Sequence, residues 1–446
     1  MKVEVQWKKV VKPSALTPHH RQKLKLSSMD ELQTPNYVGI IFYYRDNAEN
    51  SGVDTLKRLR RMEESLSETL TIFYPMAGRY VEDDGCFIDC NDHGVEFVHA
   101  KVDARIDQII RGEPDLDLLD RLSKFPTEAV GNPLVVIQAN VFECGGLVIG
   151  LHISHKIGDM YTMAMFMNSW AAMCRGNMHK IVCPSFELSS IFPPKEPSFG
   201  SWPEPGIGNE KFVMSTFRFD GKAISKLKAQ ATADAPDSIA DNWQPSRVEV
   251  VSALITRALV DIDRNKHGKL RPFVVCMTMN LRERIGLAIP TNSCGNLYTT
   301  IAAQLDRSMA DESKLVFQEV VNMISEMVRN SRARYAKVAD AEELRSMVKD
   351  SLMDFTELAF TSEEHLIPFS SWCRFGLYKN DFGWGWPDLV GLASLNFKSV
   401  FLIDDEDNGG IYAWVTLKED EMIPFKHDAE IRAFTSLVGD TCRLNY

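Results

Sequence analysis

The segment GLHISHKIGDM, residues 150–160, brings two imidazoles and a carboxylate close together in the chain. His155 follows His152 by three residues, and Asp159 follows His155 by four. Imidazole and carboxylate groups can ligate a metal ion, and a single imidazole can also act as a general base near neutral pH. The same side chains can instead be ordinary packed residues, so three interpretations have to be compared.

Metal binding is the least supported of the three. A metal site needs several donors that converge at about 2 Å from one point. Residues 146–154 have the composition of a β-strand, so His152 points to one face and the chain turns before His155. No HExxH spacing places two histidines on one face of a helix. We therefore expect no metal, and we expect His152 to be a packed strand residue.

A catalytic base at position 155 fits the local sequence better. Residues 154–158 join a buried strand to a helix, where a side chain can be presented at the edge of a sheet without disrupting the core. At this joint His155 could accept a proton from an alcohol or an amine. Asp159 stands at the expected N-cap of the helix, so we interpret it as structural rather than as the partner that orients His155. From these residues alone, a catalytic His155 and a buried His155 are equally supported.

The elements that would position these residues follow from hydrophobic periodicity. Two strands, 134–142 and 146–154, are separated by a hairpin-like break. A helix follows Asp159 with apolar residues at helical spacing, and Gly176 ends it after a basic residue. Upstream we expect a strand at 37–45 and an amphipathic helix at 54–70.

A proline- and glycine-rich stretch divides the chain almost in half. Residues 193–208 contain five prolines and three glycines, a composition that excludes a helix or a central strand and indicates an extended linker. After it we expect a strand at 212–220, helices from 221 and at 246–263, a strand at 272–281, a helix at 311–333 and two strands within 398–417. The prediction is an α/β protein with two domains of similar size, 1–192 and 211–446, joined by a linker at 193–210.

Composition excludes some partners and compartments. The chain has 446 residues, too many for one hydrophobic core, and its formal net charge of −11 argues against a nucleic-acid partner. The alternating N-terminal residues predict a strand rather than a signal peptide. No apolar run reaches the ~18 residues that would cross a membrane. Nine scattered cysteines without a CxxC pair indicate reduced thiols and a cytoplasmic protein.

Two motifs together place the histidine in a family pattern. HxxxD at 155–159 (HKIGD) and DFGWG at 381–385 occur in this order, and together they resemble the plant BAHD acyltransferases. The supporting segments, which run through most of the chain, are YPMAGR at 74–79, CND at 90–92 with Gly94, NLR at 280–282, GN at 295–296 and SWCR at 371–374. The segments FECGG, SHKIGD and SWCRFG look most like the vinorine synthase-like branch of alkaloid and terpenoid O-acetyltransferases.

This resemblance implies a fold and a reaction. The fold is two chloramphenicol-acetyltransferase-like domains joined by a crossover loop, with an active-site channel between them. The reaction is direct acyl transfer from a coenzyme A thioester to a hydroxyl or amine, without a metal or an acyl-enzyme. His155 matches the general base, and Trp372 matches a tryptophan whose indole N–H stabilises the developing oxyanion. Asp159 matches a structural aspartate paired with an arginine at the position of Arg282.

The other site residues also come from the resemblance. Asp381 and Gly383 belong to the DFGWG segment, which supports loop and channel architecture away from the chemistry, and a segment around 381–406 would complete the N-terminal domain. The candidate contacts are Ser252 and Arg374 for coenzyme A and Ser370 for substrate, where the family often has threonine. The YFGNC segment of the malonyl-using branch is absent, because residues 292–296 read NSCGN. The donor is therefore expected to be acetyl-CoA or another neutral acyl-CoA.

Two classes of function stay open on the sequence. The first is an acyl-CoA-dependent acyltransferase that O-acetylates a hydroxyl of a plant specialised metabolite, an alkaloid or terpenoid alcohol. The second is a catalytically silent relative that acts as a binding or regulatory protein. In either case the resemblance implies a monomer with small-molecule partners and no nucleic-acid or membrane partner. The sequence does not name the acceptor.

Overall fold

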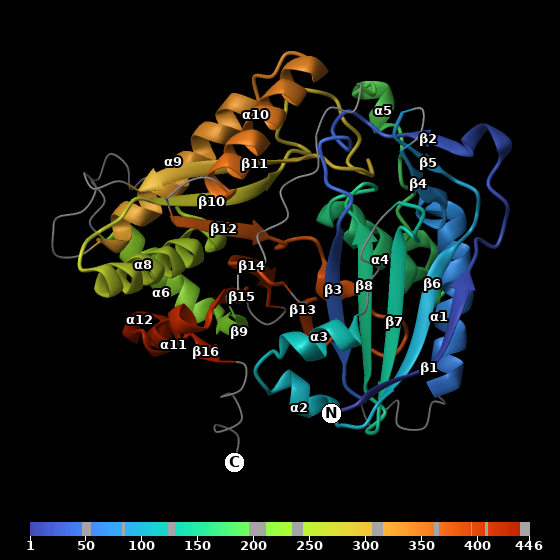
Figure 1. Cartoon of the computed structure of the whole chain (residues 1–446), viewed down its shortest axis with the longest axis horizontal. Helices are drawn as coiled ribbons and strands as arrows, with labels where there is room; N and C mark the ends of the chain where they lie inside the picture. Colours follow the sequence, from blue (N-terminus) through green and yellow to red (C-terminus); the bar gives the residue numbers. More distant parts are fainter. Residues whose placement is uncertain are drawn as a thin grey trace. The chain divides into compact units, whose positions relative to one another are not determined.

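The computed structural model divides the chain into two compact units. Unit 1 comprises Met1–Trp202, Ala288–Leu297 and Arg374–Leu395, and unit 2 comprises Pro203–Leu287, Tyr298–Cys373 and Asn396–Tyr446. Each unit contains a mixed β-sheet with helices, so the α/β class expected from the sequence is confirmed (Figure 1). The structure describes residues 1–46, 55–82, 85–123, 130–195, 211–233, 244–305, 315–360, 365–393, 395–405 and 409–437. Most of the predicted linker, 196–210, lies outside these residues.

Unit 1 is built on a six-stranded sheet. Its strands lie in the order β1 (Val3–Val11), β6 (Val95–Val102), β7 (Val135–Phe142), β8 (Leu147–Ser154), β3 (Tyr37–Tyr44) and β13 (Leu389–Leu392). β6 and β7 pair in parallel, and the other neighbours are antiparallel. A small sheet has the order β2 (Lys23–Lys25), β5 (Phe87–Asp89) and β4 (Arg79–Val81).

The helices of unit 1 include two long ones, α1 (Thr55–Ile72) and α4 (Met160–Cys174). They contact each other: the Arg61 guanidinium donates to the Cys174 carbonyl at 2.9 Å, and the Trp170 indole N–H donates to the Met62 carbonyl at 3.2 Å. The shorter helices are α2 (Ile106–Ile110), α3 (Leu116–Leu122), α5 (Leu188–Ile191) and the 3-10 turns η1 (His19–Arg21), η2 (Tyr74–Ala77), η3 (Met178–Lys180) and η5 (Leu377–Lys379).

β8 is the strand that leads to His155, and all eight of its residues are buried. A strand that is covered on both faces reads as a continuous apolar run, which is the pattern of LVIGLHIS. His152 pairs with Gly39 of β3, and a Cβ at position 39 would lie 2.3 Å from the His152 ring. Burial lowers the pKa of His152 to about 4, so the ring is neutral at physiological pH. The prediction that His152 is a packed strand residue is confirmed.

Unit 2 is built on a seven-stranded sheet. Its strands lie in the order β11 (Tyr298–Leu305), β10 (Phe273–Asn280), β12 (His365–Ser371), β14 (Ser399–Asp404), β15 (Ile411–Lys418), β9 (Phe212–Phe219) and β16 (Ser436–Leu437). β12 pairs in parallel with both of its neighbours. The helices are α6 (Gly221–Thr232), α8 (Arg247–His267), α9 (Phe317–Tyr335), α10 (Ala341–Phe360), α11 (Glu419–His427) and α12 (Ala429–Phe434).

A segment from the C-terminal half does join the N-terminal sheet. β13 pairs with β3, with Leu389 opposite Tyr43 and Leu392 opposite Ile40. The sequence analysis placed this segment around 381–406, whereas β14, at 399–404, pairs within the sheet of unit 2. The second insertion, Ala288–Leu297, was not foreseen. It ends directly before β11 and supplies residues to the site described below.

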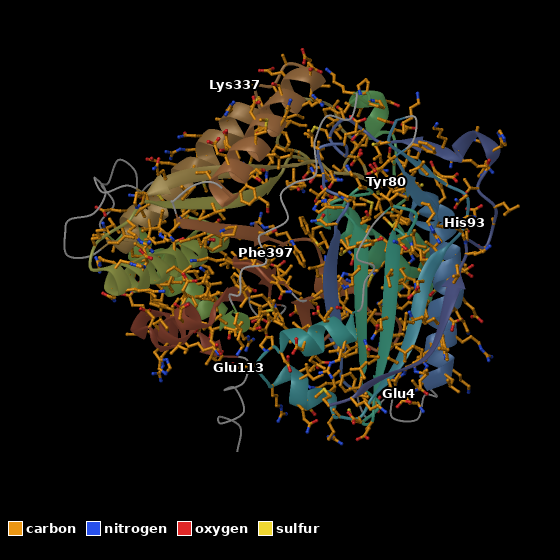
Figure 2. All side chains as sticks on the ribbon, in the orientation of Figure 1. Glu4, Tyr80, His93, Glu113, Lys337 and Phe397 are labelled. Atoms are coloured by element: carbon orange, nitrogen blue, oxygen red, sulfur yellow. The ribbon has the colours of Figure 1, made fainter. Side chains whose placement is uncertain are left out.

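Surface and core follow the usual separation of charge from apolar side chains. Glu4, Glu113 and Lys337 are exposed, whereas Tyr80 is 2% exposed (Figure 2). The fully buried large side chains include Trp170 and Trp414. Among the helices that the structure describes, none is both long enough and apolar enough to span a bilayer.

Candidate functional site

His155 lies in the turn between β8 and α4, directly after the last residue of the strand. Its backbone N–H donates to the Asn36 carbonyl at 2.8 Å, and the Ser154 N–H donates to the Leu134 carbonyl at 2.8 Å. These bonds hold the turn from both sides. His155 is only partly buried, unlike the eight residues of β8 that precede it. The strand therefore presents the imidazole at its end, as the sequence analysis expected of a catalytic base.

Asn296, from the inserted segment of unit 1, holds the His155 side chain. Its Oδ1 atom lies 2.9 Å from His155 Nδ1, and its Nδ2 atom donates to the His155 carbonyl oxygen at 2.7 Å. Both ends of one amide thus contact the same histidine. When Oδ1 accepts, Nδ1 carries the ring proton and Nε2 is the basic nitrogen. This is the form that a general base needs in order to take a proton through Nε2.

The electrostatic surroundings keep His155 neutral. Burial is the largest influence and lowers the pKa of His155, because a charged ring loses hydration. The Asp159 carboxylate and the hydrogen bond to Asn296 oppose this effect and raise the pKa, while Lys156 lowers it further. The net direction is downward from 6.5. An imidazole with this pKa is unprotonated at neutral pH and ready to accept a proton.

Asp159 is the N-cap of α4, as predicted. Its Oδ1 atom accepts from the Thr162 backbone N–H at 3.0 Å and from the Thr162 hydroxyl at 3.1 Å. Its Oδ2 atom accepts from the Leu297 backbone N–H at 3.1 Å. One carboxylate therefore caps the helix and also fastens the 288–297 segment beside it. This agrees with the structural role that the sequence analysis gave to Asp159.

Gly295 allows the inserted segment to approach the site. Its φ of 126° lies in a region that favours glycine, and a Cβ there would lie 2.6 Å from a Leu188 methyl and 3.1 Å from Asp30 Oδ1. The Gly295 carbonyl accepts from the Asp159 N–H at 3.3 Å, and the Gly295 N–H donates to the Thr162 hydroxyl at 3.1 Å. The start of α4 and the segment before β11 therefore form one hydrogen-bonded unit around His155.

The DFGWG segment supports the other end of α4. Asp381 accepts from the Gly383 N–H at 2.7 Å and forms an ion pair with Arg175, the C-cap of α4, at 3.0 Å. The Phe382 ring meets the Trp170 ring edge to face at 4.8 Å. These contacts give the DFGWG segment a role in packing and backbone geometry. Asp381 and Gly383 thus have structural surroundings in unit 1.

Unit 2 carries most of the remaining residues that the resemblance singled out. Trp372 is 4% exposed, its ring meets Phe401 at 5.1 Å, and its backbone N–H donates to the Leu402 carbonyl at 2.7 Å. The Ser370 and Thr278 hydroxyls lie 3.2 Å apart on neighbouring strands. Trp372 and Ser370 thus come from β12 and the residue that follows it.

The two candidate contacts for coenzyme A, Ser252 and Arg374, differ in exposure. Ser252 lies within α8, is 0% exposed, and its hydroxyl has no hydrogen-bond partner among the described residues, so its contact with coenzyme A stays a prediction. Arg374 is exposed and has a φ of 69°. Arg282 is 4% exposed, and its guanidinium lies 3.3 Å from Asn280 Oδ1. The pairing of Arg282 with Asp159 stays a prediction.

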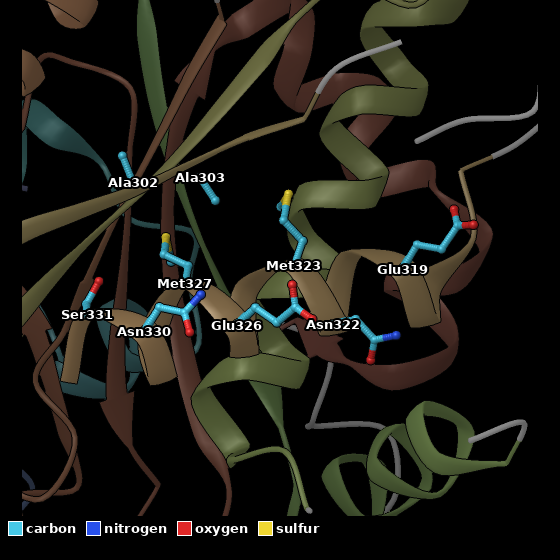
Figure 3. Close-up of a pocket in the computed structure, with 9 residues that line it drawn as sticks. All are labelled: Ala302, Ala303, Glu319, Asn322, Met323, Glu326, Met327, Asn330 and Ser331. Atoms are coloured by element: carbon cyan, nitrogen blue, oxygen red, sulfur yellow. The ribbon is translucent and has the colours of Figure 1, made fainter. Parts of the chain in front are cut away.

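A pocket of about 520 Å³ lies between β11 and α9 of unit 2 (Figure 3). Its lining combines carboxylates, amides and thioethers and contains no imidazole. The residues are Ala302, Ala303, Glu319, Asn322, Met323, Glu326, Met327, Asn330 and Ser331. None of them is a predicted site residue. In the described ranges, no group of three or more His, Cys, Asp or Glu side chains is placed to hold a metal ion.

Sequence reasoning missed the partners of His155. The sequence singles out Asn296 only as part of a GN segment, and it does not single out Asp30. Asn296 is 141 residues from His155 and 266 residues from Asp30, so no local spacing could link them. The available signals were weak: a glycine before Asn296, and the serine three residues before Asp30, a spacing typical of capped turns.

Comparison with known proteins connects this geometry to a family. The model of the Transferase family matches residues 1–432. An acetyl-CoA-benzylalcohol acetyltransferase of Clarkia breweri is 38% identical over 443 residues, which cover 98% of this chain and 100% of the relative. A stemmadenine O-acetyltransferase of Catharanthus roseus is 34% identical, with 94% of this chain and 95% of the relative covered.

The fold has solved counterparts as well. The crystal structure of vinorine synthase superposes with a TM-score of 0.81 and 30% sequence identity, covering 98% of this chain and 100% of that chain. A structure of Fusarium sporotrichioides TRI101 with coenzyme A and T-2 has a TM-score of 0.70 at 18% identity, with 94% of this chain and 100% of that chain covered. The second likeness concerns the fold alone.

Proposed function

The chain belongs to the transferase family of BAHD acyltransferases, and from this premise we propose that it transfers an acyl group from acyl-CoA to a hydroxyl of a plant specialised metabolite. The observation that carries the proposal is the state of His155. This residue stands at the end of β8, partly buried, with Nδ1 against Asn296 Oδ1 and a lowered pKa. A neutral imidazole held in this way is suited to act as a general base.

The proposed mechanism is direct transfer. The acceptor hydroxyl gives its proton to His155 Nε2 while its oxygen attacks the thioester carbonyl carbon. The C–O bond forms, negative charge develops on the carbonyl oxygen, and the Trp372 indole N–H is proposed to stabilise it. When this intermediate collapses, the C–S bond breaks and the His155 imidazolium returns the proton to the coenzyme A thiolate. Asp159, Thr162 and the 288–297 segment take no part in bond making; they keep His155 in place.

The names of the relatives guide the choice of substrates. They describe acetyl transfer to benzyl alcohol and to the hydroxyl of stemmadenine, an alcohol in each case. We propose acetyl-CoA, or another acyl-CoA with a neutral acyl group, as the donor. We propose a small alcohol of the alkaloid, terpenoid or aromatic type as the acceptor. A monomeric state and a cytoplasmic location complete the proposal; they rest on the family likeness and on the scattered cysteines of the sequence.

The test is an acyl-transfer assay with purified full-length protein. Acetyl-CoA is combined with a panel of alcohols of the three types, and release of free thiol is measured together with the acetylated product. We expect thiol release that depends on the presence of an acceptor. A protein that acetylates no alcohol or amine of a broad panel with acetyl-CoA, malonyl-CoA or an aromatic acyl-CoA would contradict the proposed function.

Trp372→Phe tests the proposed oxyanion donor. The substitution removes the indole N–H and retains an aromatic ring against Phe401. Loss of one donor to an oxyanion is expected to lower kcat about 10²-fold, with little change in KM. Trp414→Phe is the matched control, because Trp414 is a tryptophan of the same sheet that is 2% exposed and outside the proposed mechanism. If both variants retain wild-type kcat, Trp372 is a packing residue.

A further inference from the structure

Asp30 contacts the two nitrogens of Asn296, whereas His155 Nδ1 contacts the Asn296 side-chain oxygen. The Asp30 Oδ1 atom accepts from the Asn296 backbone N–H at 2.6 Å and from Asn296 Nδ2 at 2.9 Å. The Oδ2 atom accepts from the Ser27 backbone N–H at 3.1 Å and from the Ser27 hydroxyl at 2.6 Å. Asp30 is 6% exposed. A carboxyl group is therefore connected to the catalytic imidazole through one amide.

The segment that carries Asp30 is a buried loop that is held by hydrogen bonds. Residues 26–33 form neither helix nor strand, yet all eight are buried. Loops normally run over the surface, because buried backbone groups need partners. Here the Ser28 N–H donates to the Phe192 carbonyl at 3.0 Å, and Glu31 Oε2 accepts from the Lys195 N–H at 2.9 Å. Asp30 thus lies in a loop whose position is fixed by burial and by hydrogen bonds.

The pattern of donors fixes Asp30 Oδ1 as an acceptor. Both groups that face Oδ1 are N–H donors of Asn296. Only Oδ2 could therefore carry a proton, and it would direct that proton to the Ser27 hydroxyl. Burial is the largest influence on Asp30 and raises its pKa, while the hydrogen bonds from Ser27 and Asn296 lower it in part. In either protonation state Oδ1 accepts from Asn296.

The Asp30 Oδ1 acceptor in turn fixes the orientation of the Asn296 amide. The Nδ2 group has two hydrogens, and these are directed to Asp30 Oδ1 and to the His155 carbonyl. Rotating the amide by half a turn would place the Asn296 oxygen against these two acceptors and lose both hydrogen bonds. The amide oxygen must therefore face His155 Nδ1, and a nitrogen that faces an acceptor carries the proton.

We propose that Asp30 is a positioning residue for acyl transfer: through Asn296 it selects the tautomer of His155 that has its proton on Nδ1 and its lone pair on Nε2. The proposal rests on the proposed function, in which Nε2 accepts the proton of the acceptor hydroxyl. It assigns to the N-terminal loop a part in catalysis that neither sequence motif contains. Asp30 itself touches no substrate and transfers no proton.

Asp30→Asn is the informative variant. An asparagine at position 30 that keeps its oxygen towards Asn296 preserves the original orientation. If it turns its NH2 group there, it opposes the Asn296 backbone N–H, and the Asn296 amide gains by turning its own NH2 towards His155. His155 Nδ1 would become an acceptor and the proton would move to Nε2. Because the His155 carbonyl still favours the original orientation, we expect a mixture of both tautomers. We expect kcat to fall about 10-fold, with KM for both substrates nearly unchanged.

The tautomer is read directly from the 15N chemical shifts of the His155 ring in histidine-labelled protein without substrate, with the signal assigned by its loss in His155→Ala. The wild type should show a protonated Nδ1 and an unprotonated Nε2, and Asp30→Asn should add the opposite form. Asp92→Asn is the control, because Asp92 also receives two donors, from Thr17 at 2.8 and 2.6 Å, and does not contact Asn296. It should leave the His155 shifts unchanged.

Several outcomes would overturn the proposal. One is a wild type with the proton on Nε2; another is an Asp30→Asn protein with wild-type shifts and wild-type kcat. If Asp30→Asn does not fold, Ser27→Ala is the second test. It removes the hydroxyl that donates to Asp30 Oδ2 and accepts from the Asp30 backbone N–H at 3.1 Å, so Asp30 is held less firmly and a smaller change in the same direction is expected. Because the shifts are measured without substrate, a missing acyl-transfer activity with the expected tautomers would contradict the proposed function and leave the role of Asp30 intact.

Discussion

His155→Ala is expected to lower kcat for acyl transfer by about 10²- to 10⁴-fold, the usual contribution of a general base. Alanine removes the nitrogen that accepts the proton of the hydroxyl, so the acceptor must attack in its protonated form or lose its proton to water. KM should change little, because the proposed role lies in the transition state. Steady-state kinetics with acetyl-CoA and the best acceptor of the panel measure both quantities.

A matched substitution and a pH profile accompany this variant. His93→Ala removes an exposed imidazole in a loop and should keep wild-type kinetics. In the wild type, kcat/KM should be constant around neutral pH and fall as the pH drops, because a protonated base cannot accept a proton. Burial lowers the pKa of His155 below 6.5, so the fall should be centred below this value. Unchanged kcat in His155→Ala, or an acid limb centred above pH 7, would contradict the role of His155.

Substitutions of Asp159 are expected to cost more in stability than any other change near the site. In Asp159→Asn one carboxylate oxygen becomes an NH2 group, which must face either the Leu297 N–H or the two Thr162 donors. Two N–H or O–H donors that face each other in a buried place lower the free energy of unfolding by about 1–3 kcal/mol. Asp159→Ala also loses the helix cap and should cost about 2–4 kcal/mol in all. Thermal unfolding should show midpoints lower by roughly 2–4 °C for the alanine variant.

Asp220→Ala separates the cap from the additional bond to Leu297. Asp220 is the N-cap of α6, where its Oδ1 accepts only from the Ala223 N–H at 2.7 Å, and it is exposed. Asp220→Ala should lower the free energy of unfolding by about 0.5–2 kcal/mol, the contribution of a helix cap alone. An Asp159→Ala protein that unfolds at the wild-type temperature but has lost its activity would contradict the structural role, since the aspartate would then act in the chemistry itself.

Short-range sequence signals made the β8–α4 region predictable. The apolar run of β8, the capping aspartate at 159 and the glycine at 176 are all short-range signals, and the structure has strand, cap and helix end at these positions. The helix predicted at 311–333 is observed at 317–335, and residues 311–314 lie outside the described part. Boundaries shift because helix ends depend on tertiary contacts as well as on propensity.

Long-range contacts set the limit of what the sequence could predict. The family resemblance pointed to His155, but no spacing connects it with Asn296 or with the loop around Asp30, since these residues meet only in the folded chain. Ser252 shows the same limit: the resemblance suggested a contact with coenzyme A, the structure places the residue within α8 at 0% exposure, and the contact stays a prediction. A sequence pattern identifies the reacting group more readily than it identifies the atoms that orient it.

The insertion of residues 288–297 into unit 1 has a consequence for biosynthesis. A nascent chain that has left the ribosome only as far as residue 287 contains His155 and Asp159, but it lacks the Asn296 amide and the Leu297 N–H that complete their hydrogen bonds. β13, near residue 390, is also still missing at that stage. The N-terminal unit must therefore wait for the translation of most of the chain before its histidine is oriented, so synthesis from the N-terminus cannot release a competent half-enzyme.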